Sequence, residues 1–223
     1  TAVTIVQLGE VFSTLEAREK LPNPRSGYMS IAGTLLLSLL FPSPTISADS
    51  AVIIMYHRFG ENGYPNTNTT IEQLESHIRE LKSGSFTVLP VLEIMAHIKN
   101  GKFLPERTVG ITVDDGFNSV YTEGWPRFKR AQILFTVFVS TNSINQGRPN
   151  RLNWQQIREM QMEGVAFGAH SASHLHMANS SRKRNQLEII KSNNQFKMEL
   201  GEQPTIFAYP FGEASSEVFK IIA

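Results

Sequence analysis

The sequence contains no cysteine, and this absence limits the chemistry that it can perform. Without thiols the chain forms no disulfide, no thiolate nucleophile and no cysteine-type zinc site, so any bound metal must use nitrogen and oxygen ligands. The chain also lacks an excess of either charge, because 21 basic and 20 acidic residues leave a formal net charge of +1. That balance gives no reason to expect nucleic acid or an anionic membrane as the main partner. The short basic cluster 182–184 is expected to be the solvated start of a helix.

An apolar run near the N-terminus has the length of a signal-peptide core but is too short to span a bilayer comfortably. Residues 31–41 are apolar, and prolines and small residues then lead to a candidate cleavage site after Ala48. We therefore expect residues 1–50 to be an N-terminal extension with a signal-peptide-like segment at about 29–48. A buried helix at the start of the domain and a retained anchor are the alternatives. The mature domain is expected to have no membrane span and to be exported, to the periplasm, the envelope or the exterior.

From residue 51 onward, short β-rich runs alternate with longer amphipathic segments, and a hydrophobic content of 41% allows a substantial core. The expected strands are 51–56, 86–89, 109–113, 134–140, 165–169 and 205–209, and the expected helices are 71–83, 91–100, 119–130, 154–163, 181–200 and 215–222. The helix 181–200 starts after serines, carries apolar Leu187, Ile190 and Leu200, and ends before Gly201. Trp125 and Trp154 lie in helix-like segments and are expected to pack. Six βα units predict an α/β fold in residues 51–223, with a parallel sheet that is either closed as a barrel or open.

Two adjacent carboxylates follow one of the expected strands. Asp114 and Asp115 come directly after the apolar run 110–113, and Gly116 then allows a sharp turn. A metal hydrolase needs one carboxylate to bind the cation and another to take a proton from water, and adjacent residues can divide these roles. An Asp-Gly turn that caps the next helix is the simpler interpretation of the same residues.

Two histidines four residues apart follow another expected strand. His170 and His174 can lie on one face of a helical turn, or on one short loop, and so bind one ion. A pair of surface histidines at this spacing also arises by chance. His176 is expected to support the site or to face solvent, and His57, after the first strand, is expected to be a structural histidine at the rim.

A third segment, Tyr209-Pro210-Phe211-Gly212, ends the last expected strand. A turn of this kind holds backbone N–H groups and an aromatic wall over a cleft, which suits an oxyanion or a sugar ring. As an isolated turn it is common. Its interest lies in its place at the same end of the sheet as the acidic pair and the histidine pair.

In their order and spacing, these three segments resemble the motifs of the polysaccharide deacetylases, the NodB-homology family of carbohydrate esterases. Residues 112–116, Thr-Val-Asp-Asp-Gly, are similar to the Thr-Phe-Asp-Asp-Gly motif, and 170–174 are similar to His-Ser/Thr-x-x-His. Residues 209–212 are similar to Pro-Tyr-Gly, with Phe211 in place of tyrosine. Leu175 stands where a proline is usual, and Ala208 and Tyr209 stand where an arginine is often found.

The resemblance implies an irregular (β/α) barrel, usually of seven strands and here incomplete at the C-terminus. It also implies that Asp114 is the general base, that Asp115, His170 and His174 are metal ligands, and that the backbone N–H of Phe211 stabilises the oxyanion. The family's general acid is a histidine in a later Leu-x-His segment, so we expect the acid beyond residue 223.

The function that follows is a hydrolase, dependent on a divalent metal such as Zn²⁺, that removes acetyl groups from N-acetylated sugars of an envelope or extracellular polysaccharide. Its partner is then an acetylated polysaccharide or oligosaccharide. Two alternatives remain: a catalytically inactive carbohydrate-binding barrel, and a metal-dependent esterase or amidase that acts on a different acyl substrate. The oligomeric state does not follow from these residues.

Overall fold

A computed structural model describes residues 2–4, 47–48 and 50–222 of the chain. Apart from Ser47 and Ala48, the expected signal-peptide-like segment at about 29–48 lies outside the described residues. Among the residues that are described, no helix is both long enough and apolar enough to cross a membrane.

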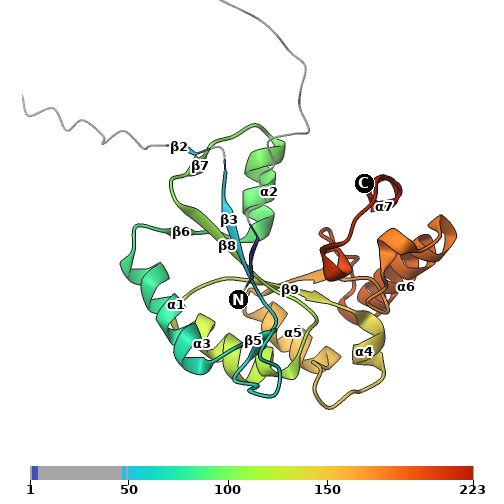
Figure 1. Cartoon of the computed structure of the whole chain (residues 1–223), viewed down its shortest axis with the longest axis horizontal. Helices are drawn as coiled ribbons and strands as arrows, with labels where there is room; N and C mark the ends of the chain where they lie inside the picture. The colour runs from blue at the N-terminus through green and yellow to red at the C-terminus, as the bar shows by residue number, and fades with distance from the viewer. Residues whose placement is uncertain (1, 5–46, 49, 223) are drawn as a thin grey trace, which may run out of the picture.

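A six-stranded sheet forms the centre of the fold (Figure 1), with the strand order β1-β3-β8-β9-β10 and β6 beside β8. The strands are β1 (Ala2–Thr4), β3 (Val52–Tyr56), β6 (Thr87–Val88), β8 (Thr108–Val113), β9 (Thr136–Val139) and β10 (Ala166–Ala169). The β1–β3 pair is antiparallel, and the other pairs are parallel. The carboxyl ends of β3, β8, β9 and β10 therefore meet at one edge of the sheet. The predicted α/β class with a parallel sheet is confirmed.

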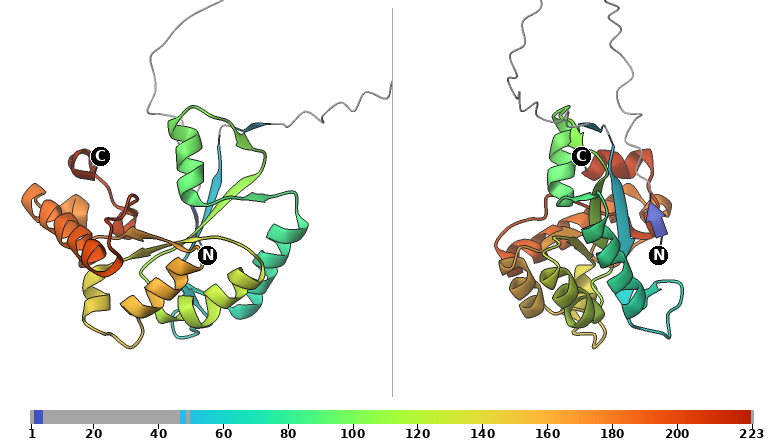
Figure 2. Two further views of the ribbon diagram at one scale, coloured as in Figure 1. Left: turned by 180° about the vertical axis from the view of Figure 1, so that it is seen from behind. Right: turned by 90° about the vertical axis from the view of Figure 1, so that its left-hand side faces the viewer.

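Helices surround this sheet: α1, α3 and α5 lie next to one another along one side, and α2 lies at the opposite end (Figure 1). The view from behind in Figure 2 shows the same arrangement. Their bounds are α1 (Ile71–Ser83), α2 (Val91–Lys99), α3 (Trp125–Arg130), α4 (Thr141–Asn145), α5 (Trp154–Met162), α6 (Arg182–Leu200) and α7 (Ser216–Ile222). Single-turn helices occur at Val120–Gly124, Met177–Asn179 and Pro210–Gly212. Two short sheets pair β2 (Ser47–Ala48) with β7 (Leu104–Pro105) and β4 (Arg58–Phe59) with β5 (Asn68–Thr69).

Local sequence signals explain where the longer helices begin and end. A capping box of Thr70 and Gln73 starts α1, and Ser181 caps α6 by accepting a hydrogen bond from the backbone N–H of Arg184. Gly201 ends α6 with a left-handed φ of 84°, as the sequence predicts. The tryptophans of α3 and α5 pack against the core as expected.

Two expectations about these elements were wrong. Residues 205–209 form no strand but a single bridge from Phe207 to Ala169, because the prolines on both sides of the segment, 204 and 210, interrupt further pairing. Residues 119–130 do not form one α-helix, since a π-helical turn precedes α3. The apolar Leu187 and Ile190 of α6 are more than half exposed, and the helix buries Phe196.

Aromatic packing fixes the strand ends that carry the site. Tyr56, at the end of β3, lies 5.4 Å from Phe59 and 6.1 Å from Phe128 between ring centroids, and Phe128 lies 4.9 Å from Phe135. All four side chains are almost fully buried. Ring contacts of this kind add to the free energy of burial and hold specific geometries. The cluster therefore ties the end of β3 and the start of β9 to α3.

Candidate metal and catalytic site

The acidic pair lies beside the end of the neighbouring strand β3. Tyr56 pairs with Val113 in the register of β3 and β8, and the backbone N–H of Asp114 donates a hydrogen bond to the carbonyl oxygen of Tyr56 at 2.9 Å. His57 follows Tyr56, so the same edge of the sheet presents an imidazole and two carboxylates. The structure thus brings His57 to the acidic pair, although the sequence favoured a structural role at the rim.

The histidine pair arrives from β10. The backbone N–H of His170 donates to the carbonyl of Val139 at 3.1 Å, which extends the β9–β10 pairing by one residue. Its Nδ1 lies 2.9 Å from the carbonyl oxygen of Ala208. A carbonyl can only accept, so Nδ1 carries the proton and Nε2 keeps its lone pair.

Asp115, His170 and His174 converge on one point. Their ligand atoms lie within 4.8 Å of one another, and Asp115 Oδ1 is 3.2 Å from His174 Nε2 and 3.7 Å from His170 Nε2. Ligands about 2.0–2.1 Å from a tetrahedral zinc ion are about 3.3 Å apart, so this spacing fits such an ion with modest adjustment. Two imidazoles and one carboxylate also form a donor set that zinc accepts, with further positions left open.

Backbone strain is concentrated at these residues. Within the described residues, six that are not glycine have positive φ, and four of them are Asp115 (72°), Ser171 (55°), His174 (58°) and Phe211 (62°). Left-handed backbone costs free energy in residues with a Cβ and persists where the surroundings enforce it. The fold therefore accepts some cost in stability at residues of the site and directly beside it.

Electrostatics prepare two of the three convergent side chains, Asp115 and His170, for a cation. Burial alone would raise the pKa of Asp115, but the hydrogen bond from His174 and electrostatic interactions with His174, His170 and Arg151 outweigh it and lower the pKa to about 2. Burial lowers the pKa of His170 to about 4. At neutral pH the carboxylate is therefore ionised and the His170 imidazole is neutral, which are the states that bind a metal.

Asp114 differs sharply from its neighbour. Burial, reinforced by the negative charge of Asp115, raises its pKa to about 7, even though His174 acts in the opposite direction. Burial also lowers the pKa of His57, on which Asp115 and His174 act electrostatically because both are close. Adjacent carboxyl groups with such different proton affinities are suited to different roles.

The raised pKa of Asp114 predicts that Asp114→Asn stabilises the metal-free protein at alkaline pH. Between the usual pKa of 3.8 and about 7, the folded protein binds more protons here than the unfolded chain, so its free energy of unfolding falls as pH rises. Asparagine does not titrate, so the variant avoids this loss of free energy of unfolding. The loss amounts to up to about 4 kcal/mol above pH 7 and to almost nothing near pH 4. Urea denaturation of both proteins at pH 4 to 8 measures it.

The prediction concerns the difference in free energy of unfolding between the parent and Asp114→Asn. The lowered pKa of His170 has the opposite effect, because its contribution to stability is lost as pH falls from 6.5 to about 4. That contribution is common to both proteins and cancels. A difference between them that does not change with pH would contradict the prediction.

Phe211 lines the site from the third segment. Its half-exposed ring stacks on His176, with 3.6 Å between centroids and 4° between planes, and meets His174 edge to face at 4.3 Å. His176 Nδ1 lies 3.0 Å from a carboxylate oxygen of Glu213. His176 thus supports Phe211, and its imidazole is not among the convergent metal-binding groups of the described residues.

The rest of the third segment faces different neighbours. The Tyr209 ring packs against Phe207 and Phe219, and Pro210 is buried. Pro210–Gly212 form a single helical turn, in which Gly212 has a φ of 67°. The segment therefore contributes to the site through Phe211, and Ala208, directly before it, contributes its carbonyl.

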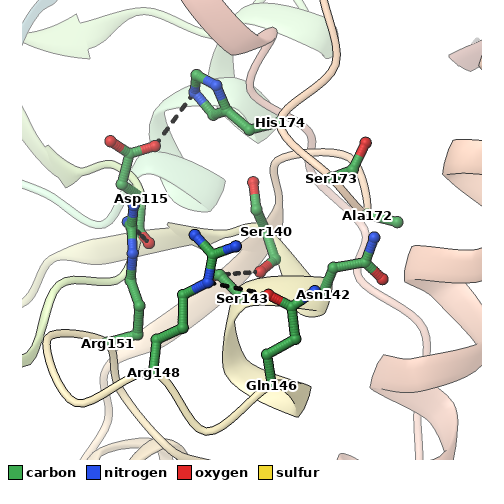
Figure 3. A pocket seen from close by; sticks show the side chains of 10 residues that line it. All are labelled: Asp115, Ser140, Asn142, Ser143, Gln146, Arg148, Arg151, Ala172, Ser173 and His174. Atoms are coloured by element: carbon green, nitrogen blue, oxygen red, sulfur yellow. Dashed lines mark hydrogen bonds and ion pairs between the residues drawn. The ribbon is translucent and has the colours of Figure 1, made fainter.

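A polar pocket of about 140 Å³ opens beside Asp115 and His174 (Figure 3). Ser140, Asn142 and Ser143 come from the end of β9 and from α4, and Arg148 and Arg151 come from the following loop.

Arg58, Phe117 and Arg151 form a second group of residues that the sequence analysis did not identify. Both guanidinium groups lie over the Phe117 ring, and Arg151 Nη1 donates to the backbone carbonyl of Asp115 at 2.7 Å. Sequence distance hides the arrangement, because a bridge between Phe117 and Arg151 brings together loops 34 residues apart. The only local signal was an arginine directly after the Tyr56-His57 pair.

Comparison with known proteins covers the acidic pair and the histidine pair. The model of the family described as polysaccharide deacetylase matches residues 101–223. The Bacillus subtilis protein YxkH, named as a polysaccharide deacetylase, is 27% identical over 168 residues, which cover 75% of this chain and 59% of that protein. A poly-β-1,6-N-acetyl-D-glucosamine N-deacetylase of Staphylococcus aureus is 27% identical over 201 residues, 78% of this chain and 69% of the enzyme. The chain thus spans about three fifths of the length of the first relative.

Solved structures share the fold. IcaB from Ammonifex degensii superposes with a TM-score of 0.71 at 23% identity, covering 78% of this chain and 80% of that one. The Streptococcus pyogenes deacetylase PplD, in complex with acetate, gives a TM-score of 0.70 at 21% identity, with coverage of 76% and 77%.

Proposed function

Because the chain belongs to the polysaccharide deacetylase family, we propose that it is a metal-dependent hydrolase that removes acetyl groups from N-acetylated sugars of an extracellular or envelope polysaccharide. The observation that carries the proposal is the convergence of Asp115, His170 and His174 beside a second carboxyl group with a pKa of about 7. The Staphylococcus aureus relative acts, by its name, on poly-β-1,6-N-acetyl-D-glucosamine, which supports an N-acetylglucosamine polymer as substrate.

We assign the metal to Asp115, His170 and His174, with Zn²⁺ as the ion that the donor set fits best. When bound, such an ion supplies Lewis acidity that polarises the acetyl carbonyl and makes water more acidic. The protein's part is to hold the ligands in place. The hydrogen bond from His170 Nδ1 to the Ala208 carbonyl fixes the tautomer and the ring orientation.

Asp114 is the general base of the proposal. Asp114 is only 8% exposed, and its pKa in the metal-free protein is about 7, a proton affinity suited to a base that works near neutral pH. It lies one residue from a proposed ligand but outside the convergent set, so it is available to take the proton of the attacking water.

Phe211 and the turn around it form the substrate side of the site. The exposed ring beside His174 offers an apolar face to a sugar, and its backbone N–H is the oxyanion donor that the family resemblance implies. Tyr209, Pro210 and Gly212 shape that turn.

His57 is our candidate for the general acid within the described residues. Its imidazole is close to Asp115 and His174, is partly exposed and is not one of the convergent ligands. Burial lowers the pKa of His57, which makes the protonated ring a readier donor to the leaving amine. This candidate competes with the acid expected beyond residue 223.

Acetate release measures the proposed activity. After treatment with a chelator, the full chain is expected to release no acetate from chito-oligosaccharides or from poly-β-1,6-N-acetylglucosamine, and Zn²⁺ is expected to restore release. His174→Ala removes a proposed ligand and should weaken zinc affinity by more than the ~10- to 100-fold typical of outer-shell partners. His97→Ala is the control, because that imidazole lies on α2, bonds to the carbonyl of Phe103 and is not one of the convergent ligands.

Each of the other outcomes would contradict a different part of this proposal. Absence of zinc binding by the parent chain would overturn the metal site. Zinc binding and glycan affinity without acetate release would indicate a carbohydrate-binding barrel. Acetate release from acetylated xylan but not from chito-oligosaccharides would indicate an ester substrate.

We also propose that the protein is exported and acts on polysaccharide outside the cytoplasm. Support comes from the signal-peptide-like run in the N-terminal extension 1–50 and from the nature of the proposed substrate. Residues 51–223 form the proposed deacetylase domain.

A further inference from the structure

The side chains of Tyr64, Arg58, Phe117 and Arg151 form a continuous stack that ends at the backbone of Asp115. The Cζ of Arg58 lies 3.7 Å from the centroid of the Tyr64 ring and 3.3 Å from that of Phe117, and the Cζ of Arg151 lies 3.8 Å from the Phe117 centroid. Two guanidinium groups this close to one ring must occupy its opposite faces. Cation–π contacts attract the guanidinium to the ring face, most strongly where both are buried, as Arg58 and Phe117 are.

One end of the stack is anchored to the fold. Arg58 is 8% exposed and pairs with Glu61 at 2.6 Å, and Glu61 also accepts a hydrogen bond from the Ser119 hydroxyl at 2.6 Å. The same hydroxyl accepts from the backbone N–H of Phe59 at 3.2 Å. The charge of Arg58 is therefore matched, and its position is tied to β4 and to the turn after β8.

The other end of the stack reaches the proposed metal ligand. Arg151 Nη1 donates to the backbone carbonyl of Asp115 at 2.7 Å, and in Figure 3 its side chain runs up to that residue. The neighbouring Arg148 bonds through Nε to Gln146 instead. Arg151 thus acts on the backbone of Asp115 and leaves its carboxylate free to face the two histidines.

The backbone at this point needs such support. Asp115 and Gly116 both have left-handed φ values, 72° and 62°, and a Cβ at Gly116 would lie 2.8 Å from the Val139 side chain. The loop of Arg151 clamps the turn through a second contact, from the Leu152 N–H to the Gly116 carbonyl at 2.9 Å. Strained backbone persists only where its surroundings hold it.

We propose that Arg151 is a positioning residue for the metal site: stacked on Phe117, it holds the Asp115 carbonyl and so aims the carboxylate at His170 and His174. The inference rests on the proposed function, since it concerns the affinity of the same site for its metal. It assigns a role to an arginine that none of the three sequence motifs contains.

The sign of the effect separates positioning from simple electrostatics. A positive charge near a cation site repels the cation, so loss of an arginine charge by itself should tighten metal binding. Loss of a group that orients a ligand should weaken it, typically about 10- to 100-fold. Arg148→Met and Arg151→Met remove the same charge from the same pocket, but only the second removes the bond to Asp115.

Competition titration of Zn²⁺ into the metal-free full chain tests the inference. Arg151→Met is expected to weaken zinc affinity about 10- to 100-fold. Arg148→Met is expected to leave it unchanged or slightly tighter. Arg151→Lys, which keeps a donor but not the planar stack, is expected to fall between Arg151→Met and the parent. Thermal unfolding of each metal-free variant measures its folding separately.

The outcomes are distinguishable. Zinc affinity of Arg151→Met equal to or tighter than that of the parent would overturn the positioning role. If that variant does not fold, unchanged affinity in Arg151→Lys would overturn it equally. Equal weakening in Arg148→Met would also do so, because a contact with Asp115 would then be irrelevant. A parent chain that binds no zinc would instead refute the proposed function itself.

Discussion

Asp114→Asn is expected to lower kcat for acetate release by about 100- to 10,000-fold, the usual contribution of a general base. Asparagine keeps the size of the side chain but cannot accept a proton from water. Zinc affinity should stay within about threefold of the parent value, because Asp114 lies outside the convergent ligand set. Steady-state kinetics on chito-oligosaccharides and a zinc titration on the same preparation measure the two quantities.

The matched control is the same substitution one residue later. Asp115→Asn should bind zinc more weakly and lose activity for that reason, so saturating zinc should restore part of its turnover. In Asp114→Asn, added zinc should restore none. In the parent, activity should rise with pH through the pKa of the base, which a bound cation lowers below the metal-free value of about 7. Turnover of Asp114→Asn within about fivefold of the parent would remove Asp114 from this role.

Much of the site follows from strand ends that the sequence marks clearly. The fully buried run 108–113 and the run 166–169 are apolar segments followed at once by carboxylates or histidines. Parallel strands place such residues at one edge whatever the strand order, so the convergence of Asp115 with His170 and His174 could be predicted. The order of the motifs then identified the family, which the family model confirms.

Other features depend on tertiary neighbours that a single sequence does not reveal. Residues 205–209 have strand composition, yet flanking prolines reduce them to one bridge. The stack through Phe117 requires a loop that returns after 34 residues to meet Arg151. The position of His57 depends on the register that sets Tyr56 beside Val113, and nothing in either segment specifies that pairing.

His57→Gln is expected to lower kcat for N-acetyl substrates by about 100- to 1,000-fold if His57 protonates the leaving amine. An amine is a poor leaving group and needs that proton, whereas 4-nitrophenolate leaves without one. Hydrolysis of 4-nitrophenyl acetate by His57→Gln should therefore fall less than about fivefold. Asp114→Asn should lose activity on both substrates, since water must be deprotonated in either reaction.

The dependence on the leaving group decides where the acid lies. His97→Gln, a histidine substitution on α2, should retain the parent activity on both substrates. Equal losses on the amide and the activated ester in His57→Gln would mean that His57 positions a neighbour and donates no proton. An unchanged rate on the amide would place the acid elsewhere, as the family resemblance implies for a segment beyond residue 223. A selective loss on the amide would locate the acid at the end of β3, where the register with β8 already sets His57 beside the base.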